Sequence, residues 1–130
     1  MHITWRMWDL LERTRLFALA VQGFCRRLPL TAESQEAASQ LRRAANSVRS
    51  NYRAARRGRS RREFQAKLGT VWEEADECVD WLTYFRDTNI RHDPALLQES
   101  RELARIFAKA VRTAREPPKD QKERGGAEGT

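Results

Sequence analysis

Apolar side chains recur every three or four residues along most of the chain, which is the spacing of an α-helix that buries one face. Prolines break the interior of a helix, and here they stand outside the periodic stretches, at Pro29, Pro94, Pro117 and Pro118. The pattern therefore predicts an all-α chain of four helices, with a tail after the last one.

The first expected helix spans about residues 5–28 and ends at Pro29. Its apolar residues follow one heptad line: Leu10, Phe17, Val21, Phe24 and Leu28. The second spans about 32–57, and we expect Gly58 to close it in a left-handed conformation. Its inward line consists mostly of small side chains: Ala37, Leu41, Ala44, Val48, Asn51 and Ala55. An amide at Asn51 is expected to form a hydrogen bond that fixes the helix register.

Ser60 and Glu63 form a capping box that predicts the start of the third helix. This helix carries the longest heptad line of the chain: Phe64, Leu68, Val71, Ala75, Cys78, Leu82 and Phe85. Asp93 followed by Pro94 predicts the start of the fourth helix, which should run to about Arg115. Its apolar face consists of Leu96, Leu103, Ile106, Phe107, Ala110 and Val111.

Short connections favour antiparallel neighbours, so the four helices are expected to form an up-down-up-down bundle, one domain over residues 1–115. The last fifteen residues, EPPKDQKERGGAEGT, contain no apolar side chain larger than alanine. Such a segment cannot offset the entropy of ordering, so residues 116–130 are expected to be a disordered, charged tail.

Positive charge is concentrated in one part of the chain. The 130 residues contain 25 Lys and Arg against 18 Asp and Glu, a net charge of +7. Between Ala37 and Arg62 there is no acidic residue, while nine are arginine. Arg42, Arg49, Arg53 and Arg56 are expected to form a stripe beside the core face of the second helix. The stripe continues into a basic turn that holds Arg57, Arg59, Arg61 and Arg62.

Three uses of this arginine stripe are open. Guanidinium groups can pair with successive phosphates of a nucleic acid, and each contact releases counterions. They can instead pair with an acidic cluster on the third helix: Glu73, Glu74, Asp76, Glu77 and Asp80. They can also form a solvated face without a partner.

Trp81 and Tyr84 lie with Glu63, Glu74 and Glu77 on one flank of the third helix, outside its heptad line. Aromatic side chains in such a place either form a subunit interface or cover the edge of their own bundle, and the pattern leaves both open.

The motifs of enzymes and metal proteins are absent from the sequence. Its two histidines, His2 and His92, stand near helix edges, and Cys25 and Cys78 fall within helices, where we expect reduced core residues. There is no glycine-rich phosphate loop or catalytic triad, so we expect no enzyme activity, no metal and no cofactor. No apolar run approaches the ~20 residues that cross a bilayer, and the start does not look like a leader. We therefore expect a cytoplasmic protein without membrane contact.

Several segments carry a family resemblance: Phe17–Val21, Leu28 with Pro29, QLRRAANSVRSNYRAA over 40–55, Ser60 with Glu63 and Phe64, Lys67 with Leu68, and EEADECVDWL over 73–82. Over about residues 10–86 the chain resembles the bacterial four helix bundle proteins, also called 23S rRNA intervening-sequence proteins. The resemblance implies a left-handed bundle whose members can assemble as homopentamers. Some relatives are encoded within insertions in large-subunit ribosomal RNA genes. Others are accessory variability proteins that act with the reverse transcriptase of diversity-generating retroelements.

The usual polar positions of that family correspond here to Gln40, Arg43, Asn51, Glu74, Glu77 and Trp81. The chain departs from the family at Arg49 and Ser50, where a Gly-Ala pair is common, and at Asp80, where an aromatic residue is common. The first departure adds charge to the arginine stripe, and the second removes an aromatic contact.

The sequence thus predicts a non-enzymatic, homo-oligomeric bundle that binds RNA or a ribonucleoprotein partner. The residues expected to contact nucleic acid are Arg42, Arg49, Arg53, Arg56, Arg57, Arg59, Arg61 and Arg62. Those expected to serve subunit contacts or structure are Gln40, Arg43, Asn51, Glu74, Glu77, Trp81 and Tyr84. The alternative is a protein-interaction scaffold or reverse-transcriptase accessory subunit, in which the arginines contact subunits and partners. A reverse transcriptase or a ribosomal component is the partner that the resemblance implies.

Overall fold

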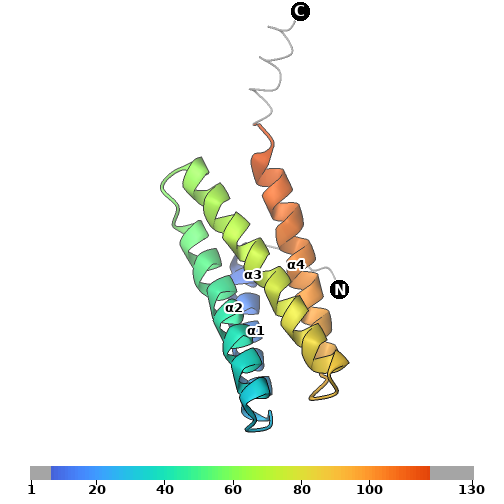
Figure 1. Ribbon diagram of the computed structural model, residues 1–130. Helices are drawn as coiled ribbons and strands as arrows, with labels where there is room; N and C mark the ends of the chain where they lie inside the picture. The colour runs from blue at the N-terminus through green and yellow to red at the C-terminus, as the bar shows by residue number, and fades with distance from the viewer. Residues whose placement is uncertain (1–6, 118–130) are drawn as a thin grey trace, which may run out of the picture.

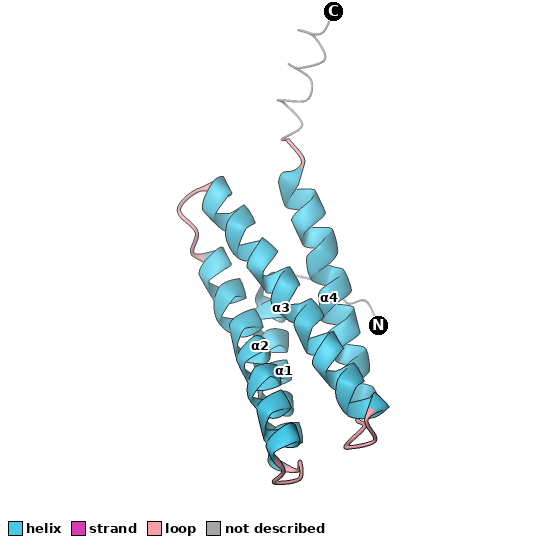
Figure 2. Cartoon of the chain, viewed as in Figure 1, coloured by secondary structure: helices cyan, strands magenta, loops and turns pink. Residues whose placement is uncertain are grey.

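The computed structural model describes residues 7–117, which form four helices and no strand (Figures 1 and 2). The helices are α1 (Met7–Arg26), α2 (Ala32–Arg56), α3 (Arg61–Asp87) and α4 (Pro94–Arg115). The predicted all-α class is confirmed. Residues 5 and 6 of the first expected helix, and the expected tail beyond residue 117, lie outside the described residues.

Side-chain caps begin three of the helices where the sequence predicts. Thr31 accepts a hydrogen bond from Ser34 N at 3.2 Å, Ser60 from Glu63 N at 3.1 Å, and Asp93 from Leu96 N at 3.0 Å. In the capping box Glu63 accepts from the backbone N–H of Arg59 at 3.0 Å, one residue before the usual donor. These bonds satisfy amides that the first turn of a helix leaves unpaired.

Successive helices run in opposite directions, with connections that alternate between the two ends of the bundle (Figure 1). α2 packs on α1 and α3, and α3 packs on α4. α1 and α4 meet over a smaller seam that closes the ring. The described part of α1 begins near the middle of the bundle in Figure 1, while α3 and α4 extend past it. The arrangement brings all four apolar faces to one core.

The core is contiguous and includes most residues of the predicted heptad lines, while Phe64, Ile106 and Ala110 are partly buried against it and Asn51 is not part of it. Its fully buried members include Leu41, Val48, Val71, Phe85 and Phe107. Cys25 and Cys78 are buried and unbridged, as expected. Small residues on α2, such as Ala38 and Ala44 at 0% exposure, allow its neighbours to approach closely.

The expected left-handed conformation of Gly58 is wrong. Arg57, with a φ of −102°, caps the C-terminal end of α2, and no glycine within residues 7–117 has a positive φ. Glycine relieves crowding at position 58 instead, because a Cβ there would lie 3.1 Å from the Ala55 carbonyl oxygen and 3.3 Å from Phe64 N. The left-handed residue is Asn89, with φ 58°, after the end of α3.

The expected register-fixing bond of Asn51 is also wrong. Its amide is half-buried and donates to Ser47 of the same helix, to the carbonyl oxygen at 2.9 Å and to Oγ at 2.8 Å. The inward position belongs to Tyr52, which is 2% exposed and places its ring 5.3 Å from that of Phe107. A straight helix drifts from a seven-residue repeat, so the heptad line pointed one residue away from the buried one.

Candidate nucleic-acid interface

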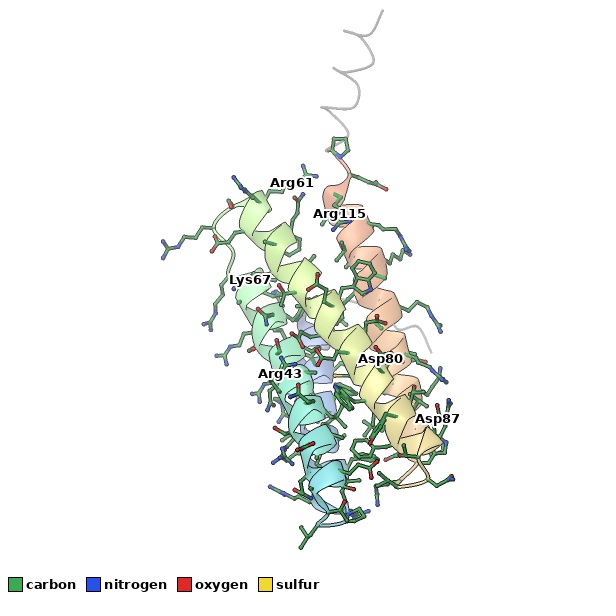
Figure 3. All side chains as sticks on the ribbon, in the orientation of Figure 1. Arg43, Arg61, Lys67, Asp80, Asp87 and Arg115 are labelled. Carbon is green, nitrogen blue, oxygen red and sulfur yellow. The ribbon has the colours of Figure 1, made fainter. Side chains whose placement is uncertain are left out.

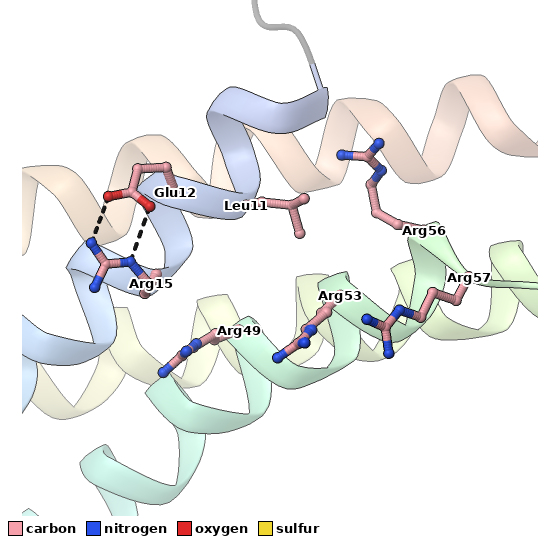
Figure 4. A pocket seen from close by; sticks show the side chains of 7 residues that line it. All are labelled: Leu11, Glu12, Arg15, Arg49, Arg53, Arg56 and Arg57. Carbon is pink, nitrogen blue, oxygen red and sulfur yellow. Dashed lines mark hydrogen bonds and ion pairs between the residues drawn. The ribbon is translucent and has the colours of Figure 1, made fainter.

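Three arginines follow one another along the second half of α2 at four-residue intervals: Arg49, Arg53 and Arg57. We call them the arginine ridge. Figure 4 shows their side chains in a row, while Arg56 points away from them beyond Leu11. Arg53 and Arg57 are exposed and Arg49 is half-buried. Residues four apart share one face of a helix, so the ridge follows from the local periodicity of the sequence.

A hollow of about 700 Å³ lies on one side of the arginine ridge, between α1 and α2 (Figure 4). It is lined by the ridge, by Arg56 and by three residues of α1, which are Leu11, Glu12 and Arg15. Glu12 pairs with Arg15 at 2.6 Å, and this hydrogen bond holds the pKa of Glu12 below its ordinary value. The one carboxylate of the hollow is therefore already neutralised by an arginine of its own helix.

A second hollow, of about 740 Å³, lies on the other side of the arginine ridge, between α2 and α3. Asn46, Ser50, Glu63 and Lys67 line it together with the ridge. Lys67 adds a cation from α3 (Figure 3). The basic surface thus extends across three helices, from Arg15 on α1 over the ridge to Lys67 on α3.

Arg43 is an arginine of α2 that forms ion pairs with the acidic cluster of α3. Its guanidinium lies 2.8 Å from Glu77 and 3.7 Å from Glu74. Among the ion pairs within residues 7–117, none involves the side chains of Arg49, Arg53, Arg56 or Arg57. The ridge is therefore not neutralised by the carboxylates that the sequence offered as its alternative partners.

The other arginines of the predicted site are spread over different surroundings. Arg42 is half-buried near the Cys25 thiol and does not line either hollow. Arg61 donates to the carbonyl oxygens of Ala114 and Glu116 at the end of α4, so it serves the fold (Figure 3). Arg59 is exposed in the turn before α3, and Arg62 is exposed in the first turn of α3. The structure thus brings together Arg49, Arg53, Arg56 and Arg57 and separates the remaining four.

The polar flank of α3 covers the seam between α2 and α3. Trp81 and Tyr84 are half-buried, with ring centroids 5.5 Å apart. Tyr84 O–H donates to Glu33 at 2.6 Å, and Trp81 Nε1 donates to Glu77 at 3.4 Å. Gln40 accepts a bond from Arg43 at 3.2 Å, which joins it to the same network. The residues predicted for subunit contacts thus have partners in their own chain, apart from any role in assembly.

Glu74 has an unusual environment within this network. Burial, and next the neighbouring carboxyl of Glu77, raise the pKa of Glu74 above its ordinary value of 4.5. One of its oxygens, Oε2, is buried without a hydrogen-bond partner among the described residues. The ion pair with Arg43 at 3.7 Å is too long to offset this cost in full.

Arg15 and Lys67 are missed by the sequence argument. Each stands on a helix other than α2, and no local pattern links them to the arginine stripe. Only the packing of α1 and α3 against α2 brings their charges beside the ridge.

None of the helices in the described part of the chain is long and apolar enough to cross a membrane. Within residues 7–117 there is no group of three metal-ligating side chains.

Comparison with known proteins gives one family match. Residues 6–112 match the family described as 23S rRNA-intervening sequence protein. No curated protein matches the chain. The solved structures include a similar one, the crystal structure of a protein of unknown function from the S23 ribosomal protein family of Bacteroides thetaiotaomicron VPI-5482. It is 21% identical, with a TM-score of 0.72 over 82% of this chain and 97% of the other. At this identity the likeness shows the fold alone.

Proposed function

The chain belongs to the 23S rRNA-intervening sequence protein family, and from this premise we propose that it is a non-enzymatic helical bundle that binds RNA through the arginine ridge. In this proposal the two hollows beside the ridge receive the phosphate backbone, and Arg15, Arg56 and Lys67 add charge at their edges. The family name alone does not assign RNA binding to this chain. The proposal rests on the placement of its charges.

The observation that carries the proposal is a row of guanidinium groups that form no ion pair among the described residues; the carboxylate that acts on the row, Glu12 near Arg49, is itself paired with Arg15. Four residues of helix correspond to about 6 Å along the axis, so neighbouring members of the ridge can reach successive phosphates. Like charges at this spacing repel one another, and a polyanion removes that repulsion. Arginine suits the role because its planar fork can contact a phosphate through two N–H groups.

We propose that the protein reads the RNA backbone and not its bases. Among the residues whose side chains the structure describes, no aromatic residue lines either hollow, so this part of the site offers no ring on which a base could stack. Phosphate contacts set position and carry no sequence information directly. Binding should therefore be similar for RNAs of different sequence, with a preference set by shape.

The test is charge reversal of the ridge, Arg49→Glu with Arg53→Glu and Arg57→Glu, in one chain. Fluorescence anisotropy with a labelled RNA hairpin should show loss of binding, while circular dichroism keeps the helix signal, because exposed arginines contribute little to stability. For the wild type, the slope of log K against log salt should be steeper than about −2, since each phosphate contact adds roughly −0.7 to −0.9.

A matched control reverses three exposed arginines outside both hollows: Arg26→Glu, Arg27→Glu and Arg101→Glu. This variant has the same change in net charge and should keep most of its RNA affinity. If both variants lose affinity equally, only net charge matters and the ridge is not a site. If the ridge variant instead dissociates an oligomer or unfolds, the arginines serve subunit contacts and the protein is a scaffold.

A further inference from the structure

A third concave surface lies between α3 and α4, with Leu10 of α1 and Tyr52 of α2 in its floor, and its chemistry differs from that of the two hollows beside the arginine ridge. Its volume is about 730 Å³. We call it the α3–α4 groove. Its apolar lining consists of Leu10, Tyr52, Phe64, Leu68, Ile106, Phe107, Ala110 and Ala114. In Figure 1 the described part of α1 begins lower than the ends of α3 and α4.

One edge of the α3–α4 groove is basic. Arg105, Lys109 and Arg112 stand on α4, four and three residues apart, and all three are exposed. Among the residues whose side chains the structure describes, no acidic one lines the groove. Among the ion pairs within residues 7–117, none involves these three cations. An apolar floor with a purely cationic edge complements a helix that has one apolar face and one acidic face.

The end of the α3–α4 groove is held in place by bonds between the two helices. Arg61 Nη2 donates to the Ala114 carbonyl oxygen at 3.2 Å, and Gln65 Nε2 donates to the same oxygen. The first turn of α3 thereby holds the last turn of α4. The groove is thus formed before any partner arrives, which lowers the cost of binding.

We propose that the α3–α4 groove binds a short acidic amphipathic helix of a partner protein. The lining residues of α4 run from Arg105 to Ala114, a rise of about 14 Å, which matches two to three turns of a bound helix. Apolar side chains of that helix at positions i, i+3 and i+7 lie on Leu68, Ile106 and Ala110. Its carboxylates face Arg105, Lys109 and Arg112.

The lining favours a protein over RNA. Tyr52 is 2% exposed and Phe107 is 0% exposed, so their rings offer no free face to a base. The rest of the floor is mostly aliphatic, and a base would gain little from stacking on it. The residues that line the groove are different from those that line the two hollows beside the arginine ridge, so its occupant need not compete with RNA for the same side chains. The proposal therefore stands apart from the proposed function.

The test uses a fluorescein-labelled peptide of about 14 residues, with leucine at helical spacing and glutamate at most other positions. Anisotropy with the full chain should show saturable binding that weakens with salt. Ile106→Asp, in the half-buried floor, should lower the affinity by at least about tenfold. Lys109→Glu with Arg112→Glu should lower it as well, while the control Arg101→Glu, on α4 outside the groove, should not. Circular dichroism verifies that each variant remains folded.

Equal binding of a peptide with lysine in place of glutamate would overturn the proposal, and so would binding that Ile106→Asp leaves unchanged. Three other occupants of the groove would each give a distinct experimental result, and each of these results would contradict the proposal. If Trp5→Ala raises peptide affinity, the chain's own first residues compete for the groove. If Ile106→Asp lowers the mass of the protein in solution, a second copy occupies it. If an RNA hairpin displaces the peptide from both wild type and ridge variant, the groove binds nucleic acid.

Discussion

Leu82 stands near the centre of the core on α3 and is 3% exposed. Leu82→Ala removes a buried side chain and leaves a cavity, so the free energy of unfolding should fall by about 2–5 kcal/mol. Urea denaturation followed by circular dichroism measures this change. The control is Leu30→Ala, because Leu30 is 93% exposed and its loss should change stability by less than about 0.5 kcal/mol. Equal effects would show that Leu82 is not in the core.

Glu74 predicts a pH dependence whose sign follows from its environment. Its pKa is raised above 4.5, so the folded chain holds the proton more tightly than the unfolded chain. As pH rises from 4.5 through the raised pKa, the folded state binds more protons, and the free energy of unfolding falls. Glutamine does not titrate, so Glu74→Gln should gain stability relative to the wild type over this range.

Urea denaturation at a series of pH values from 4 to about 7 measures the difference between the two proteins, in the range where carboxyl groups titrate. Glu73→Gln, on the exposed face of the same helix, corrects for the loss of one negative charge. A difference that is constant with pH, or that moves the other way, would show that Glu74 is not penalised by its burial and by Glu77.

At the scale of the helix, the start of α3 depends on one hydroxyl. Ser60→Ala removes the bond to Glu63 N and should lower the free energy of unfolding by about 0.5–2 kcal/mol. Thermal or urea unfolding measures it. The control is Ser50→Ala on the exposed side of α2, whose hydroxyl donates to the Ser47 carbonyl oxygen at 3.4 Å and caps nothing. If the two variants lose the same stability, the cap is not needed to start the helix.

Helix starts were predictable because caps are local: Thr31, Ser60 and Asp93 each act within three residues of themselves. The end of α2 was placed within one residue, but the conformation of Gly58 was predicted incorrectly, since the crowding there comes from Ala55 and from Phe64, beyond the turn, and not from backbone handedness. The orientation of Asn51 and Tyr52 was also missed. A one-residue shift of the inward face depends on how α2 packs against α4 side chains such as Phe107, which no pattern within α2 records.

The arginine ridge was predicted only in part. Arg49 and Arg53 share one face as expected, but the predicted stripe also held Arg42 and Arg56, whereas Arg57 completes the row and Arg56 points away from it. The surroundings of the ridge were not predictable. Whether Arg43 or the ridge meets the carboxylates of α3 depends on the rotation of two helices about their axes, and the structure gives those partners to Arg43. Arg15 and Lys67 join the surface only through packing between helices.

For the whole molecule, we expect self-association, since Trp81 and Tyr84 place two aromatic rings on the surface over the α2–α3 seam. Light scattering at micromolar concentration should give a mass several times 15.2 kDa. Trp81→Ala combined with Tyr84→Ala should lower the mass more than it lowers thermal stability. A wild-type monomer at high concentration would contradict the expectation. If the double variant unfolds without dissociating first, the two rings stabilise the fold of each chain and do not form a subunit interface.

The small seam between α1 and α4 has a consequence for how quickly the chain reaches its native state. Most contacts join helices that are neighbours in sequence, and chains of this kind fold in microseconds to milliseconds. The seam, where Arg13 lies 2.6 Å from Glu99 and 2.5 Å from Glu102, joins residues 86 and 89 positions apart in the sequence, so a long loop must close before it can form. We expect it to form after the rate-limiting step. In stopped-flow experiments Arg13→Ala should therefore accelerate unfolding and leave the refolding rate nearly unchanged. Slower refolding of this variant would show that the ion pairs of Arg13 are already formed in the folding transition state.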